Sequence, residues 1–120
     1  MAADAPRKHL RKPFWIIFSE PAPGAGDRSA AHPEHLAHQY DLEARGILFA
    51  AGPFLGADGK PSGPGMIIIR AASEAEARAI AEADPYHKLG LRTFRLQRWM
   101  LNEGTLGLRV NFSTGAYEFD

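Results

Sequence analysis

The order of strand-like and helix-like segments constrains the fold of this chain more than any other feature. Four short runs are rich in aromatic and β-branched residues or alternate in polarity, which predicts four strands. These runs are FWIIFSE (14–20), ILFAAGPFLG (47–56), MIIIRA (66–71) and LRTFRLQRWM (91–100). In the last run, alternation places Phe94 and Leu96 on one face and Arg95 and Trp99 on the other.

A helix is predicted between the first and second strands, over residues 30–46. Leu36, Tyr40 and Ala44 recur at steps of four and give this helix one apolar stripe. Gly46 is a natural end for it, because glycine tolerates the left-handed conformation that often follows a helix.

A second helix is predicted over residues 73–84, between the third and fourth strands. Ser73 and Glu76 have the spacing of a capping box, in which each side chain binds a backbone N–H near the helix start. Five residues also follow helical spacing, and the small alanines among them would let this helix lie close to a sheet. The residues with this spacing are Ala72, Glu76, Ala79, Ile80 and Ala83.

The resulting order, β-α-β-β-α-β, is that of the ferredoxin-like arrangement, an α+β fold. In this fold two helices cover one face of a four-stranded antiparallel sheet. The other face has no helix to cover its aromatic and aliphatic side chains, and a second copy of the chain would bury them. We therefore expect a homodimer.

The chain is expected to divide into three parts. Residues 1–12 form a flexible basic arm, 13–100 form the folded domain, and 101–120 form a C-terminal extension. The extension carries enough apolar residues that it should pack on its own domain or on the partner subunit, and 108–112 predict a short extra strand. The Gly- and Pro-rich segment 57–65 predicts a hairpin loop.

Composition excludes several classes of function. A length of 120 residues allows one domain with a modest core. The formal net charge is zero, which argues against a nucleic-acid partner, and no apolar run is long enough for a membrane span. Because the chain has no cysteine, disulfides and thiolate metal sites are excluded. We expect a cytoplasmic protein that binds a small molecule.

The histidines are the first candidates for chemistry. His35 and His38 lie three residues apart on the first predicted helix, so both could contact one ligand. A zinc site needs further ligands, and the sequence offers no obvious set, so no metal is expected. His35 stands beside Leu36 at the edge of the apolar stripe, where a histidine is either a packed residue or a catalyst.

Asp84 stands at the break between the second helix and Pro85. Proline disfavours helical geometry in the residue before it, so the helix should end here. Either Asp84 opens an Asx-type turn, or its carboxylate serves a partner elsewhere. Both helices lie on one face of the sheet, and if their ends meet, Asp84 would fix the tautomer of His35 and favour its charged form. That arrangement suits a general base.

Several motifs in one order resemble the YciI-like (YCII-related) family, over about residues 14–100. The two stretches that carry the resemblance are HLAHQYDLEARGILFAAGPF and ASEAEARAIAEADPYHKLGL. The matched positions are His35-Leu36, Gly46, Ala51-Gly52-Pro53 and Asp84-Pro85-Tyr86.

The resemblance implies a dimeric α+β barrel of ferredoxin-like subunits, with an active site on His35 and Asp84. One member of that family is a dehydrochlorinase acting on a chlorinated hydroxyquinol, and the fold is similar to that of muconolactone isomerases and small monooxygenases. The expected function is a cofactor-independent enzyme of lyase or isomerase type, which moves a proton on a small aromatic or lactone-like molecule. The alternative is a non-catalytic dimer that binds a small molecule or a protein, with His35 and Asp84 as a structural pair.

Four further residues are candidates for binding the substrate, namely Phe18, Pro53, Tyr86 and Arg95. Pro53 either shapes the backbone beside a pocket or marks a simple strand bulge. Arg95 either holds an anionic group of the substrate or forms a salt bridge in the dimer interface. Trp99 is expected in the core of that interface.

Overall fold

The computed structural model describes residues 6–119, so positions 1–5 of the predicted arm and Asp120 lie outside it. The chain divides into two units. One unit comprises residues 13–99, and the other comprises residues 6–12 together with 100–119.

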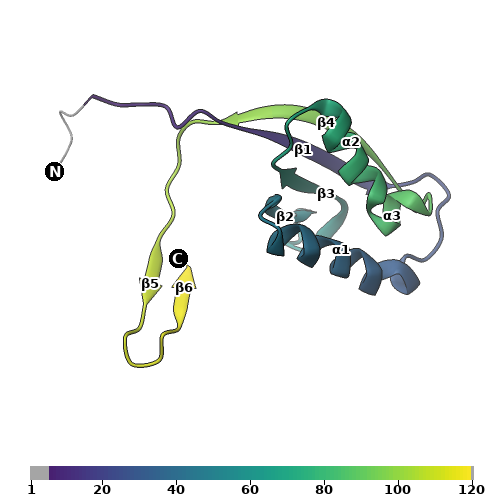
Figure 1. Ribbon diagram of the computed structural model, residues 1–120. Helices are drawn as coiled ribbons and strands as arrows, with labels where there is room; N and C mark the ends of the chain where they lie inside the picture. Colours follow the sequence, from purple (N-terminus) through teal and green to yellow (C-terminus); the bar gives the residue numbers. More distant parts are fainter. Residues whose placement is uncertain (1–5, 120) are drawn as a thin grey trace. The chain divides into compact units, whose positions relative to one another are not determined.

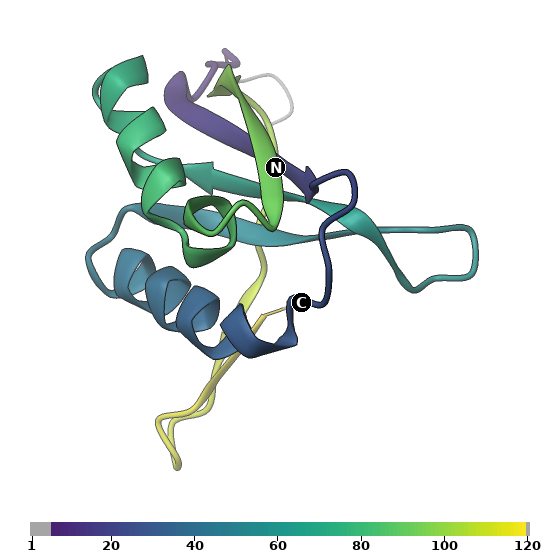
Figure 2. The same cartoon turned by 90° about the vertical axis from the view of Figure 1, so that its right-hand side faces the viewer.

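Four strands form one antiparallel sheet in the order β2-β3-β1-β4, which confirms the predicted α+β fold (Figures 1 and 2). In chain order they are β1 (Lys12–Pro21), β2 (Leu48–Leu55), β3 (Pro61–Ile69) and β4 (Arg92–Leu101). In the register of the two central strands, Ile17 pairs with Ile67 and Trp15 with Ile69. The apolar runs of the sequence therefore occupy the middle of the sheet.

The hairpin between β2 and β3 is longer than predicted, and its loop is shorter than 57–65. β3 begins at Pro61, which pairs with Leu55, and Gly65 pairs with Pro53. The prolines and glycines of this segment are typical of a loop, but they can occupy a strand here. β1 pairs with β3 only as far as Gly65, so the start of β3 has no neighbour on that side. Residues 61–64 therefore face an open edge, where a missing N–H is tolerated.

The first helix, α1 (His32–Ala44), follows a short 3₁₀ turn, η1 (Ser29–Ala31), and Gly46 follows it with φ +72°. Its predicted apolar stripe is not the buried face, because Gln39 and Leu42 are the buried residues and Tyr40 is 61% exposed. The face that turns toward the core is the one that carries His35, Gln39 and Leu42.

The second helix, α2 (Glu74–Ala83), has the predicted capping box. Ser73 Oγ accepts a hydrogen bond from the Glu76 N–H at 3.1 Å, and the Glu76 carboxylate accepts one from the Ala72 N–H at 3.1 Å. A one-turn helix that the sequence did not predict, α3 (Pro85–Lys88), follows directly.

The core lies between the sheet and both helices. Ile17, Ile67 and Ile69 of the central strands pack against Ala77 and Ala81 of α2, and all five are 8% exposed or less. The buried face of α2 therefore differs from the predicted one, although alanines do let the helix lie close to the sheet. The α1 residue Leu42 faces the same small void as Ile17 and Ile67, so both helices cover one face.

The opposite face of the sheet carries aromatic residues that arginines cover. Phe14 contacts Phe49, with ring centroids 4.6 Å apart, and the Arg70 guanidinium lies 5.4 Å from the Phe14 centroid. The Arg95 guanidinium lies 4.0 Å from the centroid of Phe18. These are cation–π contacts, which shield part of the aromatic surface from water.

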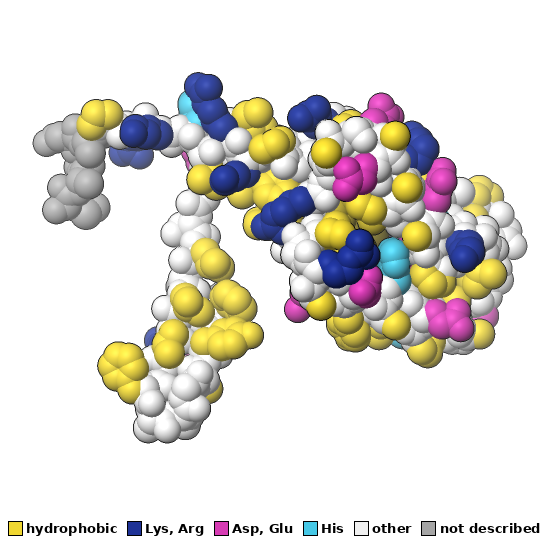
Figure 3. Space-filling view, viewed as in Figure 1, with side chains coloured by type: hydrophobic (Ala, Val, Ile, Leu, Met, Phe, Trp, Pro, Cys, Tyr) yellow, Lys and Arg dark blue, Asp and Glu magenta, His cyan; other side chains and the backbone are white. Residues whose placement is uncertain are grey.

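The other unit contains a small hairpin of β5 (Leu108–Val110) and β6 (Tyr117–Phe119), near the predicted extra strand. Its register pairs apolar residues with one another, and Figure 3 shows hydrophobic side chains gathered on it. Within the same unit, the Leu10 N–H donates to the Asn102 carbonyl at 3.0 Å.

Candidate functional site

The buried carboxylate of Asp84 organises one end of the site. Asp84 is 2% exposed and caps α3, where its Oδ1 accepts a hydrogen bond from the Tyr86 N–H at 2.9 Å. Pro85 supplies the first position of that helix, where a missing N–H is harmless. Asp84 therefore does form an Asx-type turn, as one of the two hypotheses from the sequence stated.

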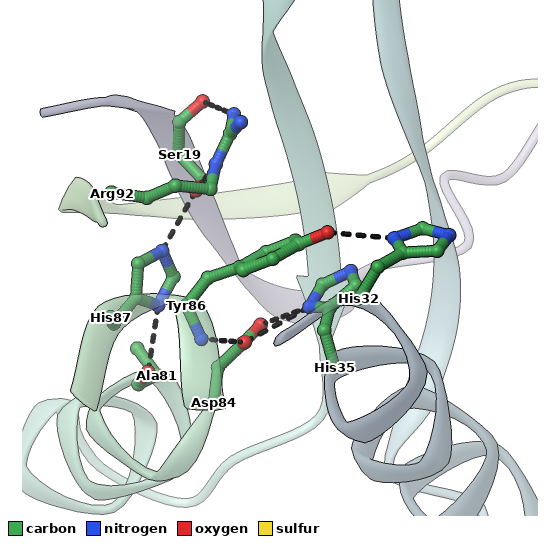
Figure 4. A network of polar contacts seen from close by, with 8 residues as sticks. All are labelled: Ser19, His32, His35, Ala81, Asp84, Tyr86, His87 and Arg92. Carbon is green, nitrogen blue, oxygen red and sulfur yellow. Dashed lines mark hydrogen bonds and ion pairs between the residues drawn. The ribbon is translucent and has the colours of Figure 1, made fainter. Parts of the chain in front are cut away.

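The same carboxylate also binds His35 of α1, which is the other hypothesis. His35 Nδ1 lies 2.9 Å from both oxygens of Asp84 (Figure 4). Burial pushes the pKa of Asp84 upward, but the hydrogen bonds that the carboxylate accepts from His35 and from the Tyr86 N–H, together with the electrostatic effect of His35 and His87, outweigh burial and hold that pKa below its usual range. Asp84 is therefore ionised at neutral pH, so His35 Nδ1 carries a proton and donates it.

This hydrogen bond leaves Nε2 of His35 as the nitrogen available for chemistry. Within residues 6–119, Nε2 has no hydrogen-bond partner. The ring of Tyr86 stacks on the imidazole, with centroids 4.2 Å apart and an angle of 21° between the planes. The imidazole is thus held by its carboxylate at one edge and by an aromatic face along its plane.

Tyr86 links this pair to a second histidine of α1. Its hydroxyl lies 2.6 Å from Nδ1 of His32 (Figure 4). Burial raises the pKa of Tyr86, although Arg28 and Arg92 lower it in part. The phenol therefore keeps its proton, and it shares a hydrogen bond with His32.

A second chain of hydrogen bonds supports α3 from the sheet side. His87 Nδ1 donates to the Ala81 carbonyl at 2.8 Å, and its Nε2 lies 2.7 Å from Ser19 Oγ. Burial lowers the pKa of His87, so the ring is neutral and Nε2 accepts the Ser19 proton. Ser19 Oγ in turn accepts from Arg92 Nε at 2.8 Å.

An open groove of about 810 Å³ lies beside these residues, within the range of small-molecule sites. Its walls come from α1, β2 and β3, and from the ends of β1 and β4. His32, His35 and Tyr86 line it, together with Leu36 and Tyr40 from the predicted apolar stripe of α1. That stripe therefore forms a wall of the groove and not a contact with the core.

The structure brings some of the predicted site residues together and separates others. His35 and Asp84 are in contact, and Pro53 and Tyr86 line the groove with His35. Phe18 and Arg95 contact each other and do not line the groove, because alternation along β1 and β4 turns them to the other face of the sheet. Trp99 lies on that same face, with its ring centroid 5.9 Å from the ring centroid of Phe14.

Several residues of the site, among them His32 and Gln39, were not assigned from the sequence. They lie three residues before and four residues after the predicted His35, so helical spacing could have shown that they share its face. Ser19 and Arg92 lie 73 residues apart, and only the pairing of β1 with β4 brings them together. No local pattern predicts that contact.

Within residues 6–119, no group of three or more histidine and acidic side chains is arranged to hold a metal ion. None of the helices in the described part of the chain is both long and apolar enough to cross a membrane.

Known proteins resemble the chain in sequence and in structure. It is 39% identical over 75 residues to the derivative of benzaldehyde biosynthesis cluster protein C from Emericella nidulans, an alignment covering 58% of this chain and 76% of the relative. Its fold is similar to that of 5-chloro-2-hydroxyhydroquinone dehydrochlorinase (TftG) from Burkholderia phenoliruptrix AC1100, solved with 2,5-dihydroxybenzoquinone. That match has a TM-score of 0.60 and 30% identity, and it covers 72% of this chain and 92% of the other.

The sequence model of the YCII-related domain matches residues 14–100, the segment that contains the sheet, the three α-helices and the groove. This match confirms the resemblance found in the sequence. The chain belongs to the family of YCII-related domains.

Proposed function

We propose that this protein is an enzyme that acts on a small molecule, with His35 as the residue that moves a proton. The observation that carries the proposal is the placement of His35. Both oxygens of a buried, ionised carboxylate hold its Nδ1, and the ring lines an open groove. Because Nδ1 donates to Asp84, the neutral form of this ring has its lone pair on Nε2, which is the form that a general base requires.

The proposed step is a proton transfer from the substrate to His35 Nε2. The electron pair left on the substrate forms a new double bond as a leaving group departs with its own electron pair, which is an elimination. In an isomerisation, His35 returns the proton at another carbon instead. In both cases the imidazolium is stabilised by Asp84, so no organic cofactor is required.

The comparisons support an oxygenated ring as the substrate. The similar structure is that of a dehydrochlorinase of a chlorinated hydroxyhydroquinone, which is an elimination of the proposed kind. The groove has room for one aromatic or lactone ring beside Tyr86 and Pro53. We propose a lyase or isomerase reaction on a small aromatic or lactone-like molecule.

We also propose that the working form is a homodimer. Phe49 and Phe54 on the sheet face away from the helices are 42% and 39% exposed. A second copy would cover this surface, as the bare face of a single-layer sheet requires.

The test compares the parent protein with His35→Ala and with Arg45→Ala as a control on the exposed end of the same helix. Chloride release from 5-chloro-2-hydroxyhydroquinone and deuterium exchange into small lactones are measured. His35→Ala should lower the rate at least about a hundredfold, the usual range for a general base, while Arg45→Ala keeps the parent rate. An active parent whose rate is unchanged in His35→Ala would overturn the proposal.

A further inference from the structure

Two arginines line the groove at the end where His32 and Tyr86 lie. Arg28 precedes η1, and Arg92 begins β4, so the two come from opposite ends of the domain sequence. Arg28, Arg92 and Tyr86 line the same groove, and both cations lower the pKa of Tyr86 against the effect of burial. Among the described residues that line the groove, Glu43 is the one acidic side chain.

Neither arginine forms an ion pair with an acid in the described part of the chain. The carboxylate adjacent to Arg28 is engaged elsewhere, because Asp27 binds the backbone N–H and hydroxyl of Ser29 at 2.9 and 2.6 Å. Arg92 donates only to neutral oxygens, those of Ser19 and of the Gly63 carbonyl. Its Nη1 makes no hydrogen bond within residues 6–119, so one edge of the guanidinium is free.

The charges of the groove are separated along α1. Glu43 follows His32 by eleven residues, which places it about 16 Å further along the helix axis. The N-terminus of this 13-residue helix lies at the arginine end, where its dipole adds positive potential. One end of the groove therefore favours an anion, and His35 lies in the first turn of α1, at that end.

A buried amide lies next to this end. Gln39 is 7% exposed, and its Oε1 has no hydrogen-bond partner within residues 6–119. It lies one helical turn after His35 and lines the same groove. A buried acceptor without a partner is unfavourable, and because Oε1 is closed off from the groove, a ligand hydroxyl would satisfy it only after the Gln39 side chain rotated toward the groove.

We propose that the groove takes an anionic, hydroxylated ring as its substrate, with the negative group held between Arg28 and Arg92. This proposal rests on the proposed function and deepens it. A carboxylate and an ionised enol of a hydroxyquinone share the required chemistry, which is a flat pair of oxygens that guanidinium groups bind in two places. The same cations stabilise the negative charge that develops on oxygen when His35 removes a proton.

The test measures binding to the full-length protein by calorimetry, with three probes. These are 2,5-dihydroxybenzoate, its neutral amide 2,5-dihydroxybenzamide, and 2,5-dihydroxybenzoquinone, which is an ionised enol at neutral pH. At least one of the two anions should bind about tenfold or more tightly than the amide, because charge-assisted hydrogen bonds are the stronger kind. Tight binding of the benzoate identifies a carboxylate as the recognised group, and tight binding of the quinone alone identifies an enolate.

Arg28→Gln should weaken the anion about tenfold and leave the amide within about twofold, whereas Arg28→Lys, which keeps the charge but loses the two-point contact, should weaken the anion less than Arg28→Gln does. Arg45→Gln removes the same charge outside the groove and serves as the control. Equal affinity for anion and amide, failure of both anions to bind, or an equal effect of Arg45→Gln would overturn this proposal. Even if one of these results were found, His35→Ala could still abolish turnover. The binding experiment can therefore fail without overturning the proposed function.

Discussion

The carboxylate of Asp84 serves two partners, which belong to different levels of the structure. The Tyr86 N–H uses Oδ1 and starts α3, while His35 Nδ1 contacts both oxygens. The first contact is a local cap that a neutral oxygen can also make. The contact with His35 depends on ionisation, because an ionised carboxylate can only accept a hydrogen bond and His35 must then donate from Nδ1. The two functions can therefore be separated by substitution.

Asp84→Asn should keep the cap and remove the effect on His35. The asparagine oxygen still accepts from the Tyr86 N–H, while its NH₂ donates to Nδ1 and leaves the proton on Nε2, where it blocks the base. We expect turnover to fall at least about a hundredfold. Asp84→Ala loses the cap as well and should destabilise the fold by about 0.5–2 kcal/mol more than Asp84→Asn.

The tautomer is read from ¹⁵N chemical shifts of the His35 ring, and stability from urea unfolding. If Asp84→Asn were fully active with the proton still on Nδ1, His35 would not depend on the carboxylate for its tautomer.

His87 makes the stability of the protein depend on pH. Burial is the main reason that the pKa of His87 lies below 6.5, the ordinary value of a histidine, with Arg92 and His35 adding to that effect and Asp84 and the Ala81 carbonyl opposing it. In the unfolded chain the ring takes up a proton as the pH falls below about 6.5, while in the folded chain it stays neutral to lower pH. The free energy of unfolding should therefore decrease as the pH falls from 7 toward 5.

Asp84 adds a second loss at lower pH. Its folded pKa lies below 3.8, so its contribution is complete above that value and disappears as the pH falls through the folded pKa. The check is urea unfolding as a function of pH for the parent, His87→Gln and the exposed His9→Gln. His87→Gln should flatten the slope between pH 7 and 5, and His9→Gln should not. Parallel curves for all three proteins would show that His87 is not the group responsible.

At the scale of elements, the sequence predicted what local patterns encode. The strand and helix order, the capping box at Ser73 and the stop at Gly46 are properties of short segments, and all three are present. The buried face of α1 differs from its apolar stripe because a polar core residue, Gln39, and a groove-lining Tyr40 reverse the usual rule. Those exceptions are the residues beside the site.

Contacts between distant residues could not be predicted in the same way. The contact of His35 with Asp84 was only conditional from the sequence, since it depends on how two helix ends meet on the sheet. The contacts among Ser19, His87 and Arg92 depend on the strand order, which local periodicity does not specify.

Two glycines on the β2–β3 pair allow a matched test of how tightly the groove wall is built. A Cβ on Gly65 would lie 3.1 Å from the Gly52 carbonyl oxygen and 3.4 Å from Pro53 Cα, both backbone atoms that cannot rotate away. A Cβ on Gly52 would meet nothing within 4 Å. Gly65→Ala should therefore destabilise the fold by about 1–3 kcal/mol.

Gly52→Ala is the control for the loss of glycine itself. It should be neutral or stabilise the fold by about 0.4–1 kcal/mol, because alanine has less conformational freedom in the unfolded chain. Both free energies come from urea unfolding at one pH. Equal effects of the two substitutions would mean that the strands separate easily at Pro53 and that this wall of the groove is not rigid.

At the scale of the whole molecule, the sheet face opposite the helices is the proposed dimer interface. Cation–π contacts from Arg70 and Arg95 cover Phe14 and Phe18, so this face is partly satisfied within one chain. Phe54 stacks near Phe18, with centroids 6.4 Å apart, and remains 39% exposed. A partner copy would have to bury aromatic rings and arginines together. Protein–protein interfaces are enriched in both residue types, so this surface has a suitable composition.

Phe54→Asp should therefore convert the proposed dimer to a monomer, because the new carboxylate would lose its water in the interface and have no designed partner there. Leu89→Asp is the matched control, since Leu89 is 61% exposed just after α3 and lies away from this face. Light scattering during size exclusion should give twice the chain mass for the parent and for Leu89→Asp. A monomeric parent, or a Phe54→Asp variant that stays dimeric, would show that this sheet face is not the interface. Arg70 and Arg95 would then be the main groups that cover its aromatic rings.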